Sequence, residues 1–359
     1  MGKIKEINFS FLPIFLVLIF AGLLRLPSFF LAHTNFDEMA YLSLALKLDK
    51  YGFKDFKDNF NLRYIEIGEN GYFKTPFIGQ RSKGNLVIGS RVNYEYRTPT
   101  HRPPGFSLLL MLSHKIFANG LPYLSSAINF NPYWTLQFYA CVVPFFFSLM
   151  MIFLTYILGI MLFSDTVGLY AALFLSLTPT ELLVSNKIWA ETTLAFFVLL
   201  SVILYFLGLR KNKPVFILFS GVSAGIAFLC KISGGFIVII ILLHHFWLRR
   251  QELGGVDKIF RNIFDIKIIY FSLTFIICSG LWILVYLKYF GPEIPNVAPS
   301  VLTPWHTIIG SRPWYTYLIN IPSQFPLYML MFGSFVSVFF DRDKKDETLF
   351  IILWFLVFL

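Results

Sequence analysis

Residues 9–31 read FSFLPIFLVLIFAGLLRLPSFFL, an apolar run with a single charged residue, Arg25. As an α-helix a run of this length extends about 34 Å, which exceeds the roughly 30 Å hydrocarbon core of a bilayer. It is also longer than the apolar part of a signal peptide, so we interpret it as a retained membrane helix. The whole chain is 57% hydrophobic and 14% charged, whereas a soluble domain has about 25% charged residues. The sequence therefore predicts an all-α polytopic membrane protein.

Further apolar runs follow along the chain and define its topology. We predict spans at residues 135–162, 168–184, 191–209, 214–230, 232–248, 267–287 and 315–340. These runs predict a single transmembrane domain, 1–359, with eight full spans. A ninth run begins at residue 348 and stops at the terminus, so we expect a C-terminal part of this domain to be missing. With a cytoplasmic N-terminus, the basic clusters at 210–213, 249–267 and 342–345 all face the cytoplasm, as the positive-inside rule predicts. The net charge of +10 is thus a topological signal, and nucleic acid is not an expected partner.

The long segment 32–134 would then form the first extracytoplasmic loop. Apolar residues at helical spacing predict a helix over 33–53, capped by Asn35. The polar stretch 58–100 contains two short alternating runs that resemble a small strand pair. Residues 105–117 are apolar but too short to span, which indicates an interfacial helix.

Two adjacent carboxylates, Asp37 and Glu38, stand just beyond the first apolar run. One interpretation is a helix start, since carboxylates in a first turn interact favourably with the helix dipole. The other is a general base that deprotonates an acceptor hydroxyl at the membrane surface. The two roles are compatible, because a rigid helix start would hold the base in position.

Four cations are predicted on the same outer face as the carboxylates: Lys187, Lys231, Arg312 and Arg102. Each could be an ordinary cation at a helix end whose charge reaches the interface. Together, opposite a carboxylate, they suit a lipid-linked phosphate whose developing negative charge they would offset. Arg25 is costly inside a span and is a candidate for the same site. Glu191, four residues after Lys187, and His101 are further candidates for support.

A divalent metal is an alternative that the residue types leave open. His33, His101 and His306 are all predicted on the outer face with the carboxylates, and both groups can serve as metal ligands. Their spacing matches no metal motif, so no ligand is assigned. The sequence contains neither a phosphate-binding loop nor a dinucleotide fingerprint.

Five short motifs, in order, carry a resemblance to a known family. They are Phe36-Asp37-Glu38, Arg102-Pro103-Pro104, Lys187-x-x-x-Glu191, Gly221-x-x-x-Gly225 with Lys231, and Arg312-Pro313-Trp314. In this order the chain resembles the membrane glycosyltransferases of the GT-C class. The similarity is to the family 39 branch, which holds protein O-mannosyltransferases and lipid A aminoarabinose transferase.

The resemblance implies a GT-C-like helical bundle that transfers a sugar from a polyprenyl-phosphate donor to a protein, lipid or glycan outside the cytoplasm, with inversion. It implies Asp37 as the base with Glu38 in support, and Lys187, Lys231 and Arg312 around the lipid phosphate. An alternative is a lipid or lipid-linked-sugar flippase in which the cations bind phosphate without chemistry. A weaker one is a structural membrane subunit whose outer loop binds a partner.

Overall fold

The computed structural model describes residues 11–30, 36–52, 103–120, 132–253, 265–290 and 350. Within these ranges the regular structure is entirely helical, which confirms the predicted all-α class. The helices are α1 (Phe11–Arg25), η1 (Leu26–Phe30), α2 (Phe36–Tyr51), α4 (Gly105–Gly120), α6 (Pro132–Leu162), α7 (Asp165–Leu177), α8 (Pro179–Ser185), α9 (Glu191–Lys211), α10 (Pro214–Cys230), η2 (Ile232–Gly235), α11 (Phe236–Leu253) and α13 (Ile266–Phe290). The proposed strand pair in 58–100 and the cap Asn35 lie outside the described residues.

Helices long and apolar enough to cross a membrane coincide with four of the predicted spans. They are Phe11–Phe30, Phe138–Leu162, Glu191–Lys211 and Ile266–Leu284. The predicted spans at 214–230 and 232–248 correspond to shorter apolar helices, and 315–340 lies outside the described residues. The protein is therefore a membrane protein with four such helices in its described part, or up to five if a bent helix pair is one span.

That bent pair is α7 and α8, which the sequence pattern predicts as one continuous span over 168–184. The two helices differ in direction by 62°. Thr178 between them is extended, with φ −62° and ψ 119°, because the ring of Pro179 disfavours helical dihedrals at the preceding residue. The predicted span 168–184 is therefore two helices with a bend between them, and Pro179 is the physical cause of the bend.

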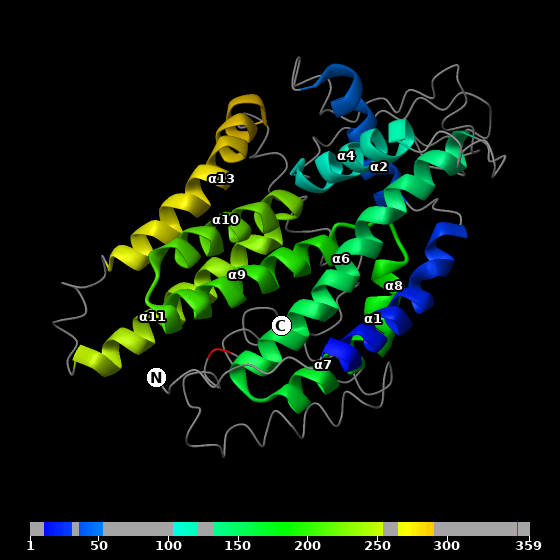
Figure 1. Cartoon of the computed structure of the whole chain (residues 1–359). Helices are drawn as coiled ribbons and strands as arrows, with labels where there is room; N and C mark the ends of the chain where they lie inside the picture. The colour runs from blue at the N-terminus through cyan, green and yellow to red at the C-terminus, as the bar shows by residue number, and fades with distance from the viewer. Residues whose placement is uncertain are drawn as a thin grey trace, which may run out of the picture.

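Local sequence signals mark several other helix ends. Ser164 caps α7 by accepting a hydrogen bond at its Oγ from the Val167 N–H, at 3.3 Å. Pro214 begins α10, where a missing N–H costs nothing. Asn212 ends α9 in the left-handed conformation, with φ 49°. These signals keep the connections short, so successive helices run back and forth between the two ends of the bundle (Figure 1).

The helices form one bundle with two short helices at one end. α6 contacts α1, α4, α7 and α9, while α10 packs between α9 and α13. α2 and α4 lie together at the end where α6 begins (Figure 1). Because α6, α9 and α10 have neighbours on several sides, they supply most of the largest apolar cluster.

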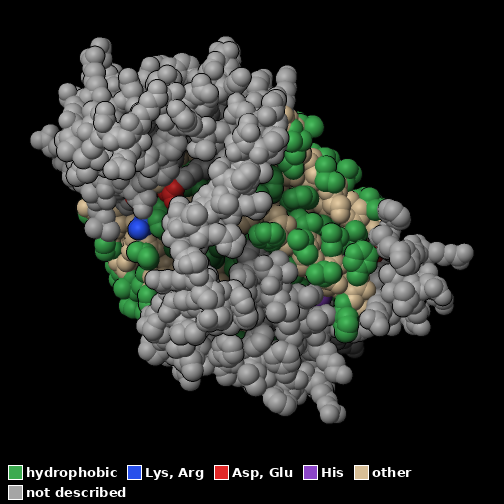
Figure 2. Space-filling view, turned by 180° about the vertical axis from the view of Figure 1, so that it is seen from behind, with side chains coloured by type: hydrophobic (Ala, Val, Ile, Leu, Met, Phe, Trp, Pro, Cys, Tyr) green, Lys and Arg blue, Asp and Glu red, His purple; other side chains and the backbone are tan. Residues whose placement is uncertain are grey.

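The described outer surface is strongly apolar. Exposed large hydrophobic side chains concentrate on α1 and α13, for example Phe11 and Leu281, each 70% exposed. Where the face in Figure 2 is described, it is mostly hydrophobic with little charge. Such extensive exposed apolar area is unfavourable in water, and it fits helices that face lipid.

Gly221 and Gly225 of the sequence motif allow α10 to pack closely on α13. A Cβ at Gly221 would collide with the Phe271 carbonyl oxygen and Thr274 Oγ1. We expect Gly221→Ala to lower the free energy of unfolding by about 1–3 kcal/mol, because backbone atoms of a packed helix cannot move aside easily. Thermal unfolding of the purified protein in detergent measures this loss.

Gly280→Ala on α13 is the matched control. Its Cβ would find its nearest atom, Ile276 Cγ2, at an ordinary 3.6 Å, so this variant should unfold at or above the wild-type temperature. Equal unfolding temperatures for Gly221→Ala and the wild type would contradict the packing argument.

Candidate functional site at one end of the bundle

The carboxylate pair lies in the first turn of α2, and its two members have different surroundings. Asp37 is partly exposed, whereas Glu38 is buried with 3% of its surface exposed. The Glu38 Oε1 accepts a hydrogen bond from the backbone N–H of Ile188 at 3.1 Å, across 150 positions of sequence. A carboxylate bond to a backbone N–H is stronger than a neutral one. It fastens the start of α2 to the turn 186–190, between α8 and α9.

An apolar cluster lies directly beside this bond. It contains Tyr41 of α2, Phe106 of α4, Ile188 and Ala190 of the turn, and Cys230 at the end of α10. The rings of Tyr41 and Phe106 meet edge to face, with centroids 4.9 Å apart. The cluster gathers at one end of the bundle the segments that carry Asp37, Lys187, Glu191 and Lys231.

The two described lysines of the predicted site have different partners. Lys187 Nζ lies 4.3 Å from the ring centroid of Trp189, a cation–π contact. Lys231 follows the last residue of α10, and its Nζ pairs with Glu191 Oε1 at 2.5 Å. Both of these side chains are 37% exposed. An ion pair exposed to this degree contributes little stability, so breaking it costs little free energy.

Arg25 is tied into a different polar network, among α1, α6 and α8. The Nε of Arg25 donates to Ser148 Oγ at 2.6 Å, and its Nη2 lies 3.6 Å from Glu181 Oε1. Ser148 Oγ in turn donates to Glu181 Oε1 at 2.6 Å. Arg25 is fully buried and the Glu181 side chain is 10% exposed. The network holds α8, whose end leads into the turn that binds Glu38.

Ser148 and Glu181 belong to none of the motifs in the sequence. Glu181 is a carboxylate within an otherwise apolar run, TPTELLV, and an ionisable residue inside a span usually has a specific partner. That signal was available, but the sequence could not identify Arg25 as the partner, because their contact depends on how α1 packs against α8.

Several predicted site residues lie outside the described part of the chain: Arg102, His101, Arg312, His33 and His306. The chain becomes described immediately after Arg102, where Pro103 and Pro104 are buried. A Cβ at Gly105 would lie only 2.7 Å from the backbone of Leu229, so the start of α4 is in close contact with the end of α10, near Lys231. Within the described ranges, no group of three or more His, Cys, Asp or Glu side chains is arranged to hold a metal ion.

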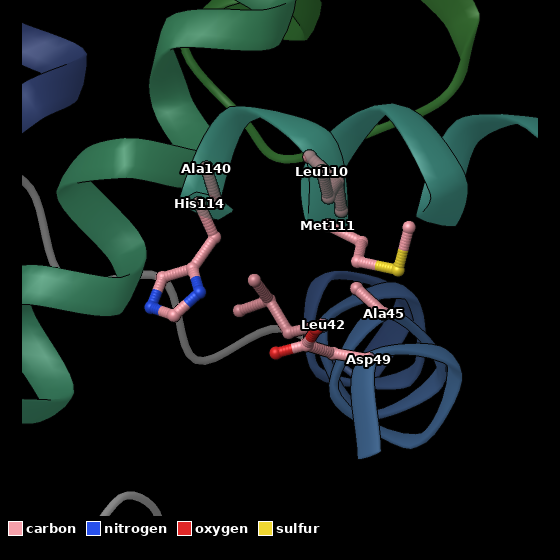
Figure 3. A pocket seen from close by; sticks show the side chains of 7 residues that line it. All are labelled: Leu42, Ala45, Asp49, Leu110, Met111, His114 and Ala140. Carbon is pink, nitrogen blue, oxygen red and sulfur yellow. The ribbon is translucent and has the colours of Figure 1, made fainter. Parts of the chain in front are cut away.

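A small pocket opens between α2, α4 and α6, and it extends along α2 from Leu42 to Asp49. Its lining residues are Leu42, Ala45, Asp49, Leu110, Met111, His114 and Ala140. Figure 3 shows Leu42 and Asp49 of α2 facing α4 across it. Asp49 is paired with Lys115 at 2.7 Å, and burial lowers the pKa of His114. Asp49 stands twelve positions after Asp37 on the same helix, or about 18 Å along its axis, whereas Leu42 at the near side of the pocket is four positions after Glu38.

Fold and site together define a polytopic, all-helical membrane protein that gathers acidic and basic side chains at one end of its bundle. The family model of dolichyl-phosphate-mannose-protein mannosyltransferase matches residues 92–295, more than half of the 359-residue chain. The chain belongs to this family, which confirms the resemblance and makes the protein a membrane glycosyltransferase. The matched range includes Arg102, Lys187, Glu191 and Lys231, while Asp37 and Glu38 precede it. No curated protein sequence matches the chain.

Proposed function

We propose that this protein transfers a mannosyl group from a polyprenyl-phosphate donor to an acceptor hydroxyl outside the cytoplasm, with inversion at the anomeric carbon. Family membership supports the donor and the sugar. The structural observation that best supports the proposed position of the site is the Glu38–Ile188 hydrogen bond. It joins the segment with the exposed carboxylate, Asp37, to the turn that contains Lys187.

The proposed reaction is a single displacement. Asp37 removes the proton of the acceptor hydroxyl as its oxygen bonds to the anomeric carbon. The bond from that carbon to the phosphate oxygen breaks, and the polyprenyl phosphate leaves with the electron pair. Lys187 and Lys231 offset the charge on the departing phosphate, together with Arg102 and Arg312. Because the phosphate is already a good leaving group, one carboxylate suffices.

Sidedness in this proposal rests on the distribution of positive charge along α9. Glu191 begins this helix near the proposed site, and Arg210 and Lys211 end it. A helix of this length extends about 31 Å, enough to place its two ends on opposite sides of a membrane. The basic end belongs in the cytoplasm by the positive-inside rule. This charge distribution supports our proposal that the carboxylate pair lies outside the cytoplasm and the N-terminus inside it.

The lipid that co-purifies with the protein tests this proposal. We expect mass spectrometry of the purified wild type to find a polyprenyl-phosphate sugar. The Lys187→Ala and Lys231→Ala variants should retain about tenfold less of it, because each loses a charge-assisted contact to phosphate. Lys211→Ala, at the opposite end of α9 from Glu191, is the matched control and should retain the wild-type amount. Equal retention in all three variants would refute the phosphate site.

A further inference from the structure

Buried polar atoms without a hydrogen bond concentrate in the segment 186–193. Of the six such side-chain atoms in the described part of the chain, four belong to this segment. They are Asn186 Oδ1, Trp189 Nε1, Thr192 Oγ1 and Thr193 Oγ1. Thr192 is 1% exposed and Thr193 is fully buried. The segment contains Ile188, where Glu38 binds, and continues into the first turn of α9.

Buried hydroxyls elsewhere in the bundle do find partners. Ser201 and Ser220 bond each other's backbone across α9 and α10, and the half-buried Thr155 on α6 donates to the Met151 carbonyl at 2.9 Å. Within a helix, a Thr hydroxyl can bond the carbonyl four residues earlier, but Thr192 and Thr193 lie in the first turn of α9, where those carbonyls belong to the preceding turn. A buried polar atom without a partner costs free energy. Several such atoms lie in one short segment beside the proposed reaction centre. This concentration points to a ligand that supplies the missing hydrogen-bond partners.

The atom types indicate what that ligand is. Asn186 offers an acceptor, Trp189 offers a donor, and the two Thr hydroxyls can do both. Alternating donors and acceptors are complementary to a ligand rich in hydroxyl groups. Lys187, which we propose as a phosphate contact, lies within the same segment. A hydroxyl-rich group directly attached to a phosphate is the sugar of a lipid-phosphate donor.

We infer that the segment 186–193 is the sugar subsite, in which Asn186, Trp189, Thr192 and Thr193 hydrogen-bond the hydroxyls of the donor sugar. This inference rests on the proposed function, because it takes the donor from there. It explains why unpartnered groups persist in a packed region, since the bound sugar satisfies them. It also makes the segment a determinant of sugar specificity, because a site built to bond hydroxyls rejects ligands that lack them.

The test combines the stability of the ligand-free protein with the binding of two lipids. Thr192→Val and Thr193→Val each remove one unpartnered hydroxyl while keeping the shape of the side chain. Without ligand, we expect these variants to unfold at or above the wild-type temperature, since a buried unpartnered group is lost. Each should bind polyprenyl-phosphate mannose about tenfold more weakly. Each should bind polyprenyl phosphate, which has no sugar, with unchanged affinity.

Thr155→Val is the matched control, because its hydroxyl already bonds Met151. It should lose some stability without ligand and bind both lipids as the wild type does. Lower stability of the ligand-free Thr192→Val and Thr193→Val variants would mean that water or protein already satisfies these hydroxyls, and would overturn the inference. Unchanged binding of polyprenyl-phosphate mannose, or an equal loss for both lipids, would also overturn it. If the wild type binds neither lipid, the proposed donor itself is wrong.

Discussion

Asp37→Asn is expected to reduce mannosyl transfer by about 10²–10⁴-fold, the range that a positioned general base contributes. The amide has nearly the shape of the carboxylate but cannot accept the acceptor's proton. Because Asp37 is partly exposed and Glu38 makes the buried bond to Ile188, the start of α2 should keep its place. The measurement is the transfer of radiolabelled mannose from polyprenyl-phosphate mannose by purified protein, alongside binding of polyprenyl phosphate.

Asp49→Asn provides the matched control for this prediction. It makes the same chemical change on the same helix, at a carboxylate paired with Lys115 at 2.7 Å and remote from Asp37. This variant should transfer mannose at close to the wild-type rate. An Asp37→Asn protein that turned over donor at an unchanged rate would rule out Asp37 as the base, whatever its binding.

Arg25→Met is expected to lower the free energy of unfolding by about 3–5 kcal/mol, because it leaves the Glu181 carboxylate uncompensated in an apolar environment. The pair is well enclosed, with Arg25 fully buried and Glu181 10% exposed. The double variant Arg25→Met with Glu181→Met should recover much of this loss, since two apolar side chains of similar volume need no counter-charge. Thermal unfolding in detergent gives the stability of the wild type, both single variants and the double variant. Together these four values form a double-mutant cycle that measures the coupling between Arg25 and Glu181.

The more exposed ion pair of Lys115 and Asp49 provides a control for the stability loss of Arg25→Met. Its side chains are 50% and 32% exposed, so Lys115→Met should cost at most about 1 kcal/mol. If Arg25→Met proved as mild as Lys115→Met, or if the double variant were as unstable as the singles added together, the two charges would not be a coupled buried pair.

Much of the fold follows from patterns that are local in sequence. The apolar run at 9–31 and the composition of the chain are sufficient for the membrane class, and the start of α2 at Phe36 agrees with the expected helix over 33–53. The short motifs, in their order, are sufficient for the family, which the match over 92–295 confirms. Pro179 was also a local signal, and its effect on the preceding residue would have predicted the bend between α7 and α8.

The arrangement of the site required the tertiary structure. Glu38 and Ile188 are 150 positions apart, and Arg25 and Ser148 are 123 apart. Hydropathy and helix periodicity describe one segment at a time, so they cannot state which buried carboxylate meets which backbone N–H or which guanidinium. The same holds for the unpartnered groups of 186–193, because burial and missing partners are properties of packing. The sequence alone determined that this is a helical membrane glycosyltransferase with Asp37 and Glu38 at a helix start. Only the packing of α1, α6 and α8 and of the turn 186–190 decided that Glu38 is buried while Asp37 is partly exposed.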